Sequence, residues 1–202
     1  MKILKVESLI IPEVKVISYQ RFADERGYFT ETFRESDLTK VISDFKIKQV
    51  NESFSQKGVL RGLHFQWNPY MGKLVRVING KIIDFFLDIR LNSSTFGKIS
   101  GFELTGNSKD DKNTWIWIPV GFAHGLLALE DSTIEYLCTD EYNPNCEAGI
   151  NPLSSDINWS ICDNDVLKKF EELKKFQLTV SEKDKAGLTL DQWKKGSRSN
   201  NF

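Results

Sequence analysis

The chain has 202 residues with 40% hydrophobic content, enough for one well-cored soluble domain. Its 27 Lys and Arg residues nearly balance 28 Asp and Glu residues, so no net field attracts nucleic acid or an anionic membrane. The three cysteines lack CxxC spacing, which argues against a disulfide framework or a zinc knuckle, and no stretch approaches the ~18 apolar residues of a membrane span. We expect a single cytoplasmic domain over residues 1–202 that contacts neither nucleic acid nor membrane.

The first part of the chain predicts edge strands and one short helix. Residues 3–17 alternate loosely in β-branched runs, and a second strand-like run covers residues 26–33. Residues 35–45 have helical spacing of apolar side chains, with Ser36 as a suitable N-cap. The apolar face of this helix would consist of Leu38, Val41, Ile42 and Phe45.

The middle of the chain predicts a series of strands separated by turn residues. The dipeptide Asn79-Gly80 lies between two apolar runs and predicts a two-residue β-hairpin. Even spacing of short strands is typical of an all-β sandwich or barrel. The expected strands cover residues 59–65, 73–78, 81–89, 96–104, 114–118, 125–129 and 134–139.

The C-terminal part predicts a helical appendage over about residues 160–180. Its amphipathic helix, residues 166–176, would pack on the barrel through one apolar face. That face would consist of Val166, Leu167, Phe170, Leu173 and the flanking Phe176. Ser181 and Asp184 have the spacing of a capping box, and residues 195–202 have too little apolar surface to predict more than a loose tail.

The two histidines of the chain fall in two motifs that resemble those of cupin barrels. His64, Gln66 and Lys73 have the spacing of the first motif, in which His, His and Glu normally bind a metal. His124 ends the run IPVGFAHG, which has the PxGxxH order of the second motif. Because Gln66 and Lys73 replace two ligands and a lysine repels a divalent cation, we expect no metal and disfavour a metal-dependent oxygenase.

Longer blocks, in the correct order, identify the chain as similar to one family. They are DERGYFTETF, QVNESFSQKGVLRGLHFQ, GKLVRVINGKIIDFFLDIR, TFGK, WIPVGFAHG and SEKDKA, and they span roughly residues 20 to 187. These blocks resemble the dTDP-4-dehydrorhamnose 3,5-epimerases, a family of metal-free cupins. The resemblance implies a jelly-roll homodimer with a few short peripheral helices. It also implies a cofactor-independent inversion of C3 and C5 in a nucleotide-linked 4-keto-6-deoxyhexose.

The resemblance also implies the residues that would move protons. His64 takes the role of the base, for which an unperturbed pKa near ~6.5 is suitable. Asp184 would orient His64, although its spacing from Ser181 equally fits a simple helix cap. Lys73 would stabilise an enolate in place of a metal. The opposite-face acid aligns with Tyr136, and Tyr142 is the competing candidate.

Substrate binding is implied for a larger set of residues. Arg61 should meet the diphosphate, but Arg61 and His64 are three apart and would face opposite sides of a regular strand. A bulge at Gly62 would turn both inward. The other implied contacts are Arg26, Glu31, Gln49, Asn51, His124, Glu147 and Lys183, some of them reaching the neighbouring subunit's site through exchanged N-terminal strands.

The chain differs from the family in two places, and two alternative functions remain to be considered. The pair Glu141-Tyr142 stands where many members have adjacent tyrosines, and the helix over residues 166–176 resembles an insertion. A C3-only or C5-only epimerase uses the same base, so the sequence does not distinguish it from a double epimerase. A non-catalytic sugar-binding cupin is disfavoured because the base, orienter, lysine and acid positions are all filled.

Overall fold

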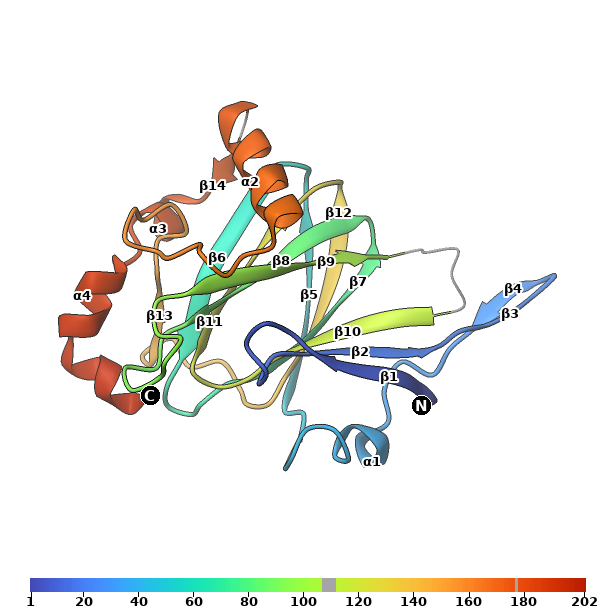
Figure 1. The fold of residues 1–202 in the computed structure, drawn as a ribbon. Coiled ribbons are helices and arrows are strands. Elements are labelled where there is room, and N and C mark those ends of the chain that lie inside the picture. The colour runs from blue at the N-terminus through green and yellow to red at the C-terminus, as the bar shows by residue number, and fades with distance from the viewer. Residues whose placement is uncertain (107–111, 177) are drawn as a thin grey trace.

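Figure 1 shows the computed structural model of the protein, which describes residues 1–106, 112–176 and 178–202. The described chain is mostly β-strands, arranged in two larger sheets that face each other as a cupin-like jelly roll. The expected all-β class is confirmed. None of the helices in these three ranges is long and apolar enough to cross a membrane.

The first sheet has six strands in the order β1-β2-β10-β7-β12-β5, and its described pairings are antiparallel. The strands are β1 (Ile3–Ser8), β2 (Lys15–Gln20), β5 (Gln49–Ser55), β7 (Lys73–Asn79), β10 (Lys112–Ile118) and β12 (Ser132–Cys138). A small hairpin of β3 (Phe22–Asp24) and β4 (Gly27–Phe29) projects away from the barrel beyond this sheet (Figure 1).

The second sheet has the order β13-β6-β11-β8-β9, and β14 adds to β6 in parallel. The strands are β6 (Val59–Gln66), β8 (Lys81–Asp88), β9 (Ile99–Thr105), β11 (Phe122–Ala128), β13 (Glu147–Gly149) and β14 (Thr179–Val180). The helices are α1 (Glu35–Leu38), α2 (Asn164–Phe176), α3 (Glu182–Lys185), α4 (Leu190–Lys195) and the 3₁₀ helix η1 (Ser197–Asn201).

Strand alternation divides the apolar side chains between the inside of the barrel and the outer faces. In β8, Ile82 and Phe86 belong to the cluster between the sheets, whereas Phe85 contacts Phe170 of α2 on the outer face, with ring centroids 5.6 Å apart. The helices α2 and α4 therefore cover the outer face of the second sheet. Residues 35–47 cover the outer face of the first sheet in the same way, with Phe45 at the edge of Trp117.

The predicted hairpin at Asn79-Gly80 is wrong, although Gly80 does occupy a turn with a φ of 89°. Strand β7 pairs with β10 and β12, and β8 pairs with β9 and β11, so the dipeptide connects the two sheets. A Cβ atom at Gly80 would lie 2.3 Å from the carbonyl oxygen of Asp131. The glycine is therefore needed for this close crossing between sheets rather than for a two-residue hairpin.

Two predicted helical features also differ from the structure. The first helix ends at Leu38 rather than at Phe45, and it begins after Arg34 without a side-chain cap, so Ser36 is not the N-cap. The β-branched residues that follow favour an irregular path, yet their side chains still fill the predicted core. In α2 the expected apolar face is buried through Val166 and Phe170, but Phe176 is 86% exposed.

The C-terminal residues 195–202 are a packed segment where the sequence suggested a loose tail. Helix η1 follows α4, and the Phe202 ring meets the edges of Phe65 and Tyr70. The Tyr70 hydroxyl donates to the carbonyl oxygen of Asn201 over 2.8 Å. One terminal aromatic residue supplies the apolar contact that the polar run before it lacks.

Candidate active site

A pocket of about 660 Å³ opens between the two sheets, a size typical of small-ligand sites. Strands β5, β6, β7, β11 and β12 provide its walls, and the segment from β14 to α3 closes one side. The predicted site residues that it brings together are Gln49, Asn51, Arg61, His64, Lys73, His124, Tyr136, Glu147, Lys183 and Asp184. Tyr142 also lines it.

An irregularity in β6 places Arg61 and His64 on the same side of the sheet. His124 of β11 lies opposite His64, but Leu126 lies opposite Arg61, so the register shifts between these pairs. Strand β6 has one extra residue in this interval, where Gly62 has a φ of 107° and approaches Gly125 too closely for a side chain. Both side chains therefore face the pocket, as the bulge at Gly62 predicts.

His64 is held by Asp184 through a short contact of 2.6 Å between Nε2 and Oδ1. The second oxygen of Asp184 accepts the backbone N–H of Gly62 over 3.3 Å. Because the carboxylate accepts from Nε2–H, Nδ1 carries the free lone pair, and no described group bonds to it. Burial lowers the pKa of His64 below 6.5, and the charge of Asp184 opposes that shift.

The two interpretations of Asp184 are compatible. Its backbone N–H donates to the Ser181 side chain over 3.1 Å, so Ser181 is the N-cap of α3 as the capping pattern predicts. Its side chain points the other way, to His64. The cap fixes the backbone position from which the carboxylate reaches the histidine.

Lys73 enters the pocket from the start of β7. Its Nζ lies 3.5 Å from the carbonyl oxygen of His64, a weak contact that leaves the ammonium group available. Burial lowers the pKa of Lys73, and the nearby groups Cys138, Asp84 and Glu147 act in the opposite direction. A desolvated cation of this kind is suited to stabilise a negative oxygen in the pocket.

Tyr136 and Tyr142 occupy different environments. The Tyr136 hydroxyl lies 2.9 Å from Ser53 Oγ, and burial raises the pKa of Tyr136 to about 12. Tyr142 is 52% exposed and donates to Glu147 over 2.8 Å. Its proton is already bound by a carboxylate, whereas no described carboxylate bonds to the Tyr136 hydroxyl.

His124 forms a second histidine–carboxylate pair that the sequence interpretation missed. Its Nε2 lies 2.8 Å from Asp84 Oδ2, and both side chains are buried. Asp84 Oδ1 has no hydrogen-bond partner in the described chain. The available signal was a lone aspartate within the apolar run KIIDFFL, because buried carboxylates need a partner.

The other predicted binding residues that line the pocket lie at its rim. Arg61 donates to Ser55 Oγ and to the Phe54 carbonyl oxygen, and Lys183 pairs with Glu147 over 2.6 Å. The rim residues Gln49 and Asn51 bond to each other over 2.8 Å. This rim therefore combines cations with amide groups, which suits a phosphorylated ligand.

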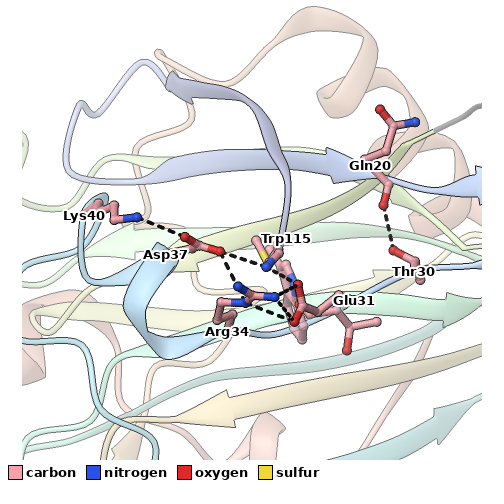
Figure 2. A network of polar contacts seen from close by, with 9 residues as sticks. Gln20, Thr30, Glu31, Arg34, Asp37, Lys40 and Trp115 are labelled. Carbon is pink, nitrogen blue, oxygen red and sulfur yellow. Dashed lines mark hydrogen bonds and ion pairs between the residues drawn. The ribbon is translucent and has the colours of Figure 1, made fainter.

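Arg26 and Glu31 are not brought into this pocket. Arg26 lies on the β3–β4 hairpin, exposed and paired with Asp24. Glu31 pairs with Arg34 at 2.7 Å, and Asp37 lies beside the same guanidinium, as Figure 2 shows. The segment is fixed to the barrel by a 2.7 Å hydrogen bond from Trp115 Nε1 to the Thr32 carbonyl oxygen.

Gln66 does not face the pocket either, because its side chain bonds to the loops at Pro69, Glu141 and Asn143. No group of three His, Cys, Asp or Glu side chains that could hold a metal ion occurs among the described residues. Of the two positions at which other cupins have metal ligands, one holds Gln66, which bonds to nearby loops, and the other holds Lys73, which lines the pocket.

The fold and the pocket define a cupin-type jelly roll with a histidine–aspartate pair, a partly buried lysine and a partly buried tyrosine. A family model described as dTDP-4-dehydrorhamnose 3,5-epimerase matches residues 8–192. The chain therefore belongs to the dTDP-4-dehydrorhamnose 3,5-epimerase family.

Three relatives illustrate the similarity. The enzyme of that name from Escherichia coli (strain K12) is 36% identical, with 95% of this chain and 96% of the relative covered. The one from Neisseria gonorrhoeae is 43% identical over 75% of this chain but only 46% of its own length. The crystal structure of dTDP-6-deoxy-D-glucose-3,5-epimerase from Legionella pneumophila Philadelphia 1, in complex with dTDP-4-keto-L-rhamnose, superposes with a TM-score of 0.79, 36% identity and 93% coverage of both chains.

Proposed function

We propose that this protein inverts C3 and C5 of dTDP-4-keto-6-deoxyglucose to form dTDP-4-keto-L-rhamnose. The observation that carries the proposal is the His64–Asp184 pair, in which Nδ1 is left as a free base in the same pocket as Tyr136. The carbon atoms beside a ketone are the ones whose protons such a base can remove. The dTDP-linked ligand of the Legionella relative supports the substrate class.

Each inversion needs one proton removed and one returned on the other face. His64 Nδ1 takes the proton from the carbon, the electron pair moves into the ketone, and an enolate forms. Tyr136 then gives its phenolic proton to the opposite face of that carbon. Proton exchange with water returns His64 to the free base and Tyr136 to the phenol before the second carbon reacts. The low pKa of His64 keeps its base form available at neutral pH, and the raised pKa of Tyr136 keeps the acid protonated until the enolate forms.

The C4 oxygen of the enolate lies against Lys73. A buried ammonium group stabilises that charge more strongly than an exposed one, because little water competes with it. His124 lies on β11 in the other sheet, with its Nε2 bound to Asp84, and it contributes a second polar side chain to the pocket. Arg61 binds the diphosphate, for which its forked donors are suited.

The working form is a homodimer in which the N-terminal strands reach the partner. The hairpin exposes Phe22, Tyr28 and Phe29 to solvent by 50%, 55% and 70%. Within the described residues, strand β5 is an unpaired sheet edge with Val50 and Phe54 each 57% exposed. Apolar hairpins and free edges favour pairing with a second copy.

In that dimer Arg26 and Glu31 contact the nucleotide bound by the partner subunit, which explains why neither reaches the pocket of its own chain. The three free cysteines are consistent with a reducing, cytoplasmic location.

Incubation with dTDP-4-keto-6-deoxyglucose, followed by NMR of the sugar, tests this function. The expected product has both centres inverted. Inversion of C3 alone or of C5 alone would replace the proposal with a mono-epimerase. Binding without any turnover would make the protein a sugar-binding cupin and contradict the proposed reaction.

A further inference from the structure

Ser53 forms a contact that the proposed reaction does not yet use. It lies on β5, diagonal to Tyr136 on the neighbouring strand β12, in a register that opposes Ile134 to Ser53 and Tyr136 to Asn51. The two hydroxyl oxygens are 2.9 Å apart. In the described chain neither hydroxyl has another hydrogen-bond partner, and both residues line the pocket.

We propose that Ser53 is a positioning residue that donates its hydroxyl proton to Tyr136 Oη. This inference rests on the proposed function and assigns the direction of one hydrogen bond within it. If Tyr136 donated to Ser53, its proton would be aimed at the sheet rather than at the substrate. With Ser53 as donor, the phenolic proton of Tyr136 remains free to point into the pocket.

The same bond stabilises the tyrosine after it has given up its proton. Burial makes the Tyr136 phenolate costly, and the negative charge of Asp84 adds to that cost. The Ser53 hydroxyl acts against both, because a donor beside a developing phenolate lowers the pKa of Tyr136. Without this donor the acid would be present but poorly able to release its proton.

This direction of donation decides what happens to the enolate. The enolate is quenched either by Tyr136, which inverts the carbon, or by protonated His64, which restores the original configuration. In D₂O the second route appears as deuterium entry without inversion. Loss of the Ser53 hydroxyl should slow the Tyr136 route by about 10- to 100-fold, the rate equivalent of a hydrogen bond to a charged group. The ratio of deuterium entry without inversion to inversion, called the exchange-to-inversion ratio, should rise by the same factor.

The experiment measures that ratio in D₂O for the wild type, Ser53→Ala, Ser53→Thr and Thr133→Ala with dTDP-4-keto-6-deoxyglucose. Ser53→Thr retains a hydroxyl and should restore the ratio. Thr133→Ala removes a hydroxyl from the same strand pair outside the pocket and should leave the ratio unchanged. A ratio in Ser53→Ala equal to that of the wild type would overturn the inference, as would weaker dTDP binding with an unchanged ratio, which would make Ser53 a substrate contact.

A second readout needs no turnover. In protein carrying ¹³Cζ-labelled tyrosine, the Tyr136 resonance is identified by its loss in Tyr136→Phe. It should move in Ser53→Ala and return in Ser53→Thr. If the wild type neither exchanges nor inverts the substrate, the proposed function has failed. The Tyr136 resonance then tests the Ser53–Tyr136 hydrogen bond by itself. A resonance that does not move in Ser53→Ala refutes that hydrogen bond.

Discussion

Replacing Asp184 by asparagine tests the proposed base through the direction of one hydrogen bond. One carboxylate oxygen accepts from His64 Nε2, and the other accepts from the Gly62 N–H. An amide has only one acceptor oxygen. If that oxygen stays with Gly62, the NH₂ group faces Nε2 and forces the histidine proton onto Nδ1, the atom that should accept the substrate proton.

The structure indicates which orientation the amide takes. The alternative orientation opposes the NH₂ group to the buried Gly62 N–H and leaves that donor unsatisfied, at a cost of about 1–3 kcal/mol. The unproductive tautomer is therefore favoured. In a Ser-His-Asp triad the corresponding substitution lowers kcat by about 10⁴-fold through the same tautomer change. We expect a loss approaching that factor, or about 5 kcal/mol in activation free energy.

The assay is the initial rate of epimerisation at saturating substrate, with two comparison variants. Glu182→Gln makes the same chemical change on the same helix, at a side chain that is 89% exposed, and should retain wild-type activity. Asp184→Ala presents no donor to Nε2 and should be less damaged than Asp184→Asn. The reasoning is refuted if Asp184→Asn stays within about ten-fold of the wild type, or if Asp184→Ala is the more severely impaired variant.

The other predictions follow from the same pocket. Lys73→Met should lower kcat by about 10²–10³-fold without loss of dTDP binding, measured by calorimetry; an unchanged kcat would remove Lys73 from the reaction. Arg61→Ala should instead weaken dTDP binding, and unaltered affinity would contradict its diphosphate role. Because burial lowers the pKa of His64 and the neutral form is the base, kcat/KM should fall with decreasing pH only below pH 6.5; a midpoint above that value would contradict the assignment. Tyr28→Ser with Phe29→Ser should convert the proposed dimer to a monomer in light scattering, and a persistent dimer would place the interface elsewhere.

Strand positions were predictable because they follow from short-range patterns, whereas the candidate site residues were named from the resemblance to the family. Alternating apolar residues predicted most strands, and the bulge at Gly62 followed from the need to place Arg61 and His64 on the same face. The hairpin predicted at Asn79-Gly80 was wrong because a turn residue indicates only the local backbone conformation, whereas strand pairing depends on distant partners. In this structure the turn at Asn79-Gly80 connects β7 in one sheet to β8 in the other.

Partners in side-chain pairs were the least predictable part of the site. Asp84 reaches His124 from a strand 40 residues earlier in the chain, and Ser53 reaches Tyr136 across 83 residues. No spacing rule connects such residues, because their contact exists only after the sheets assemble. The packed C-terminus was missed for a similar reason, since Phe202 is partly buried only by residues that fold against it.

The central claim is that His64 removes protons from one face and Tyr136 returns them on the other. Its most direct test follows deuterium at C3 and C5 by NMR in D₂O, in one series with the wild type, His64→Ala and Tyr136→Phe. The account predicts deuterium entry with inversion in the wild type, entry with retention in Tyr136→Phe, and no entry in His64→Ala. Exchange in His64→Ala at the wild-type rate, or full inversion by Tyr136→Phe, would contradict it.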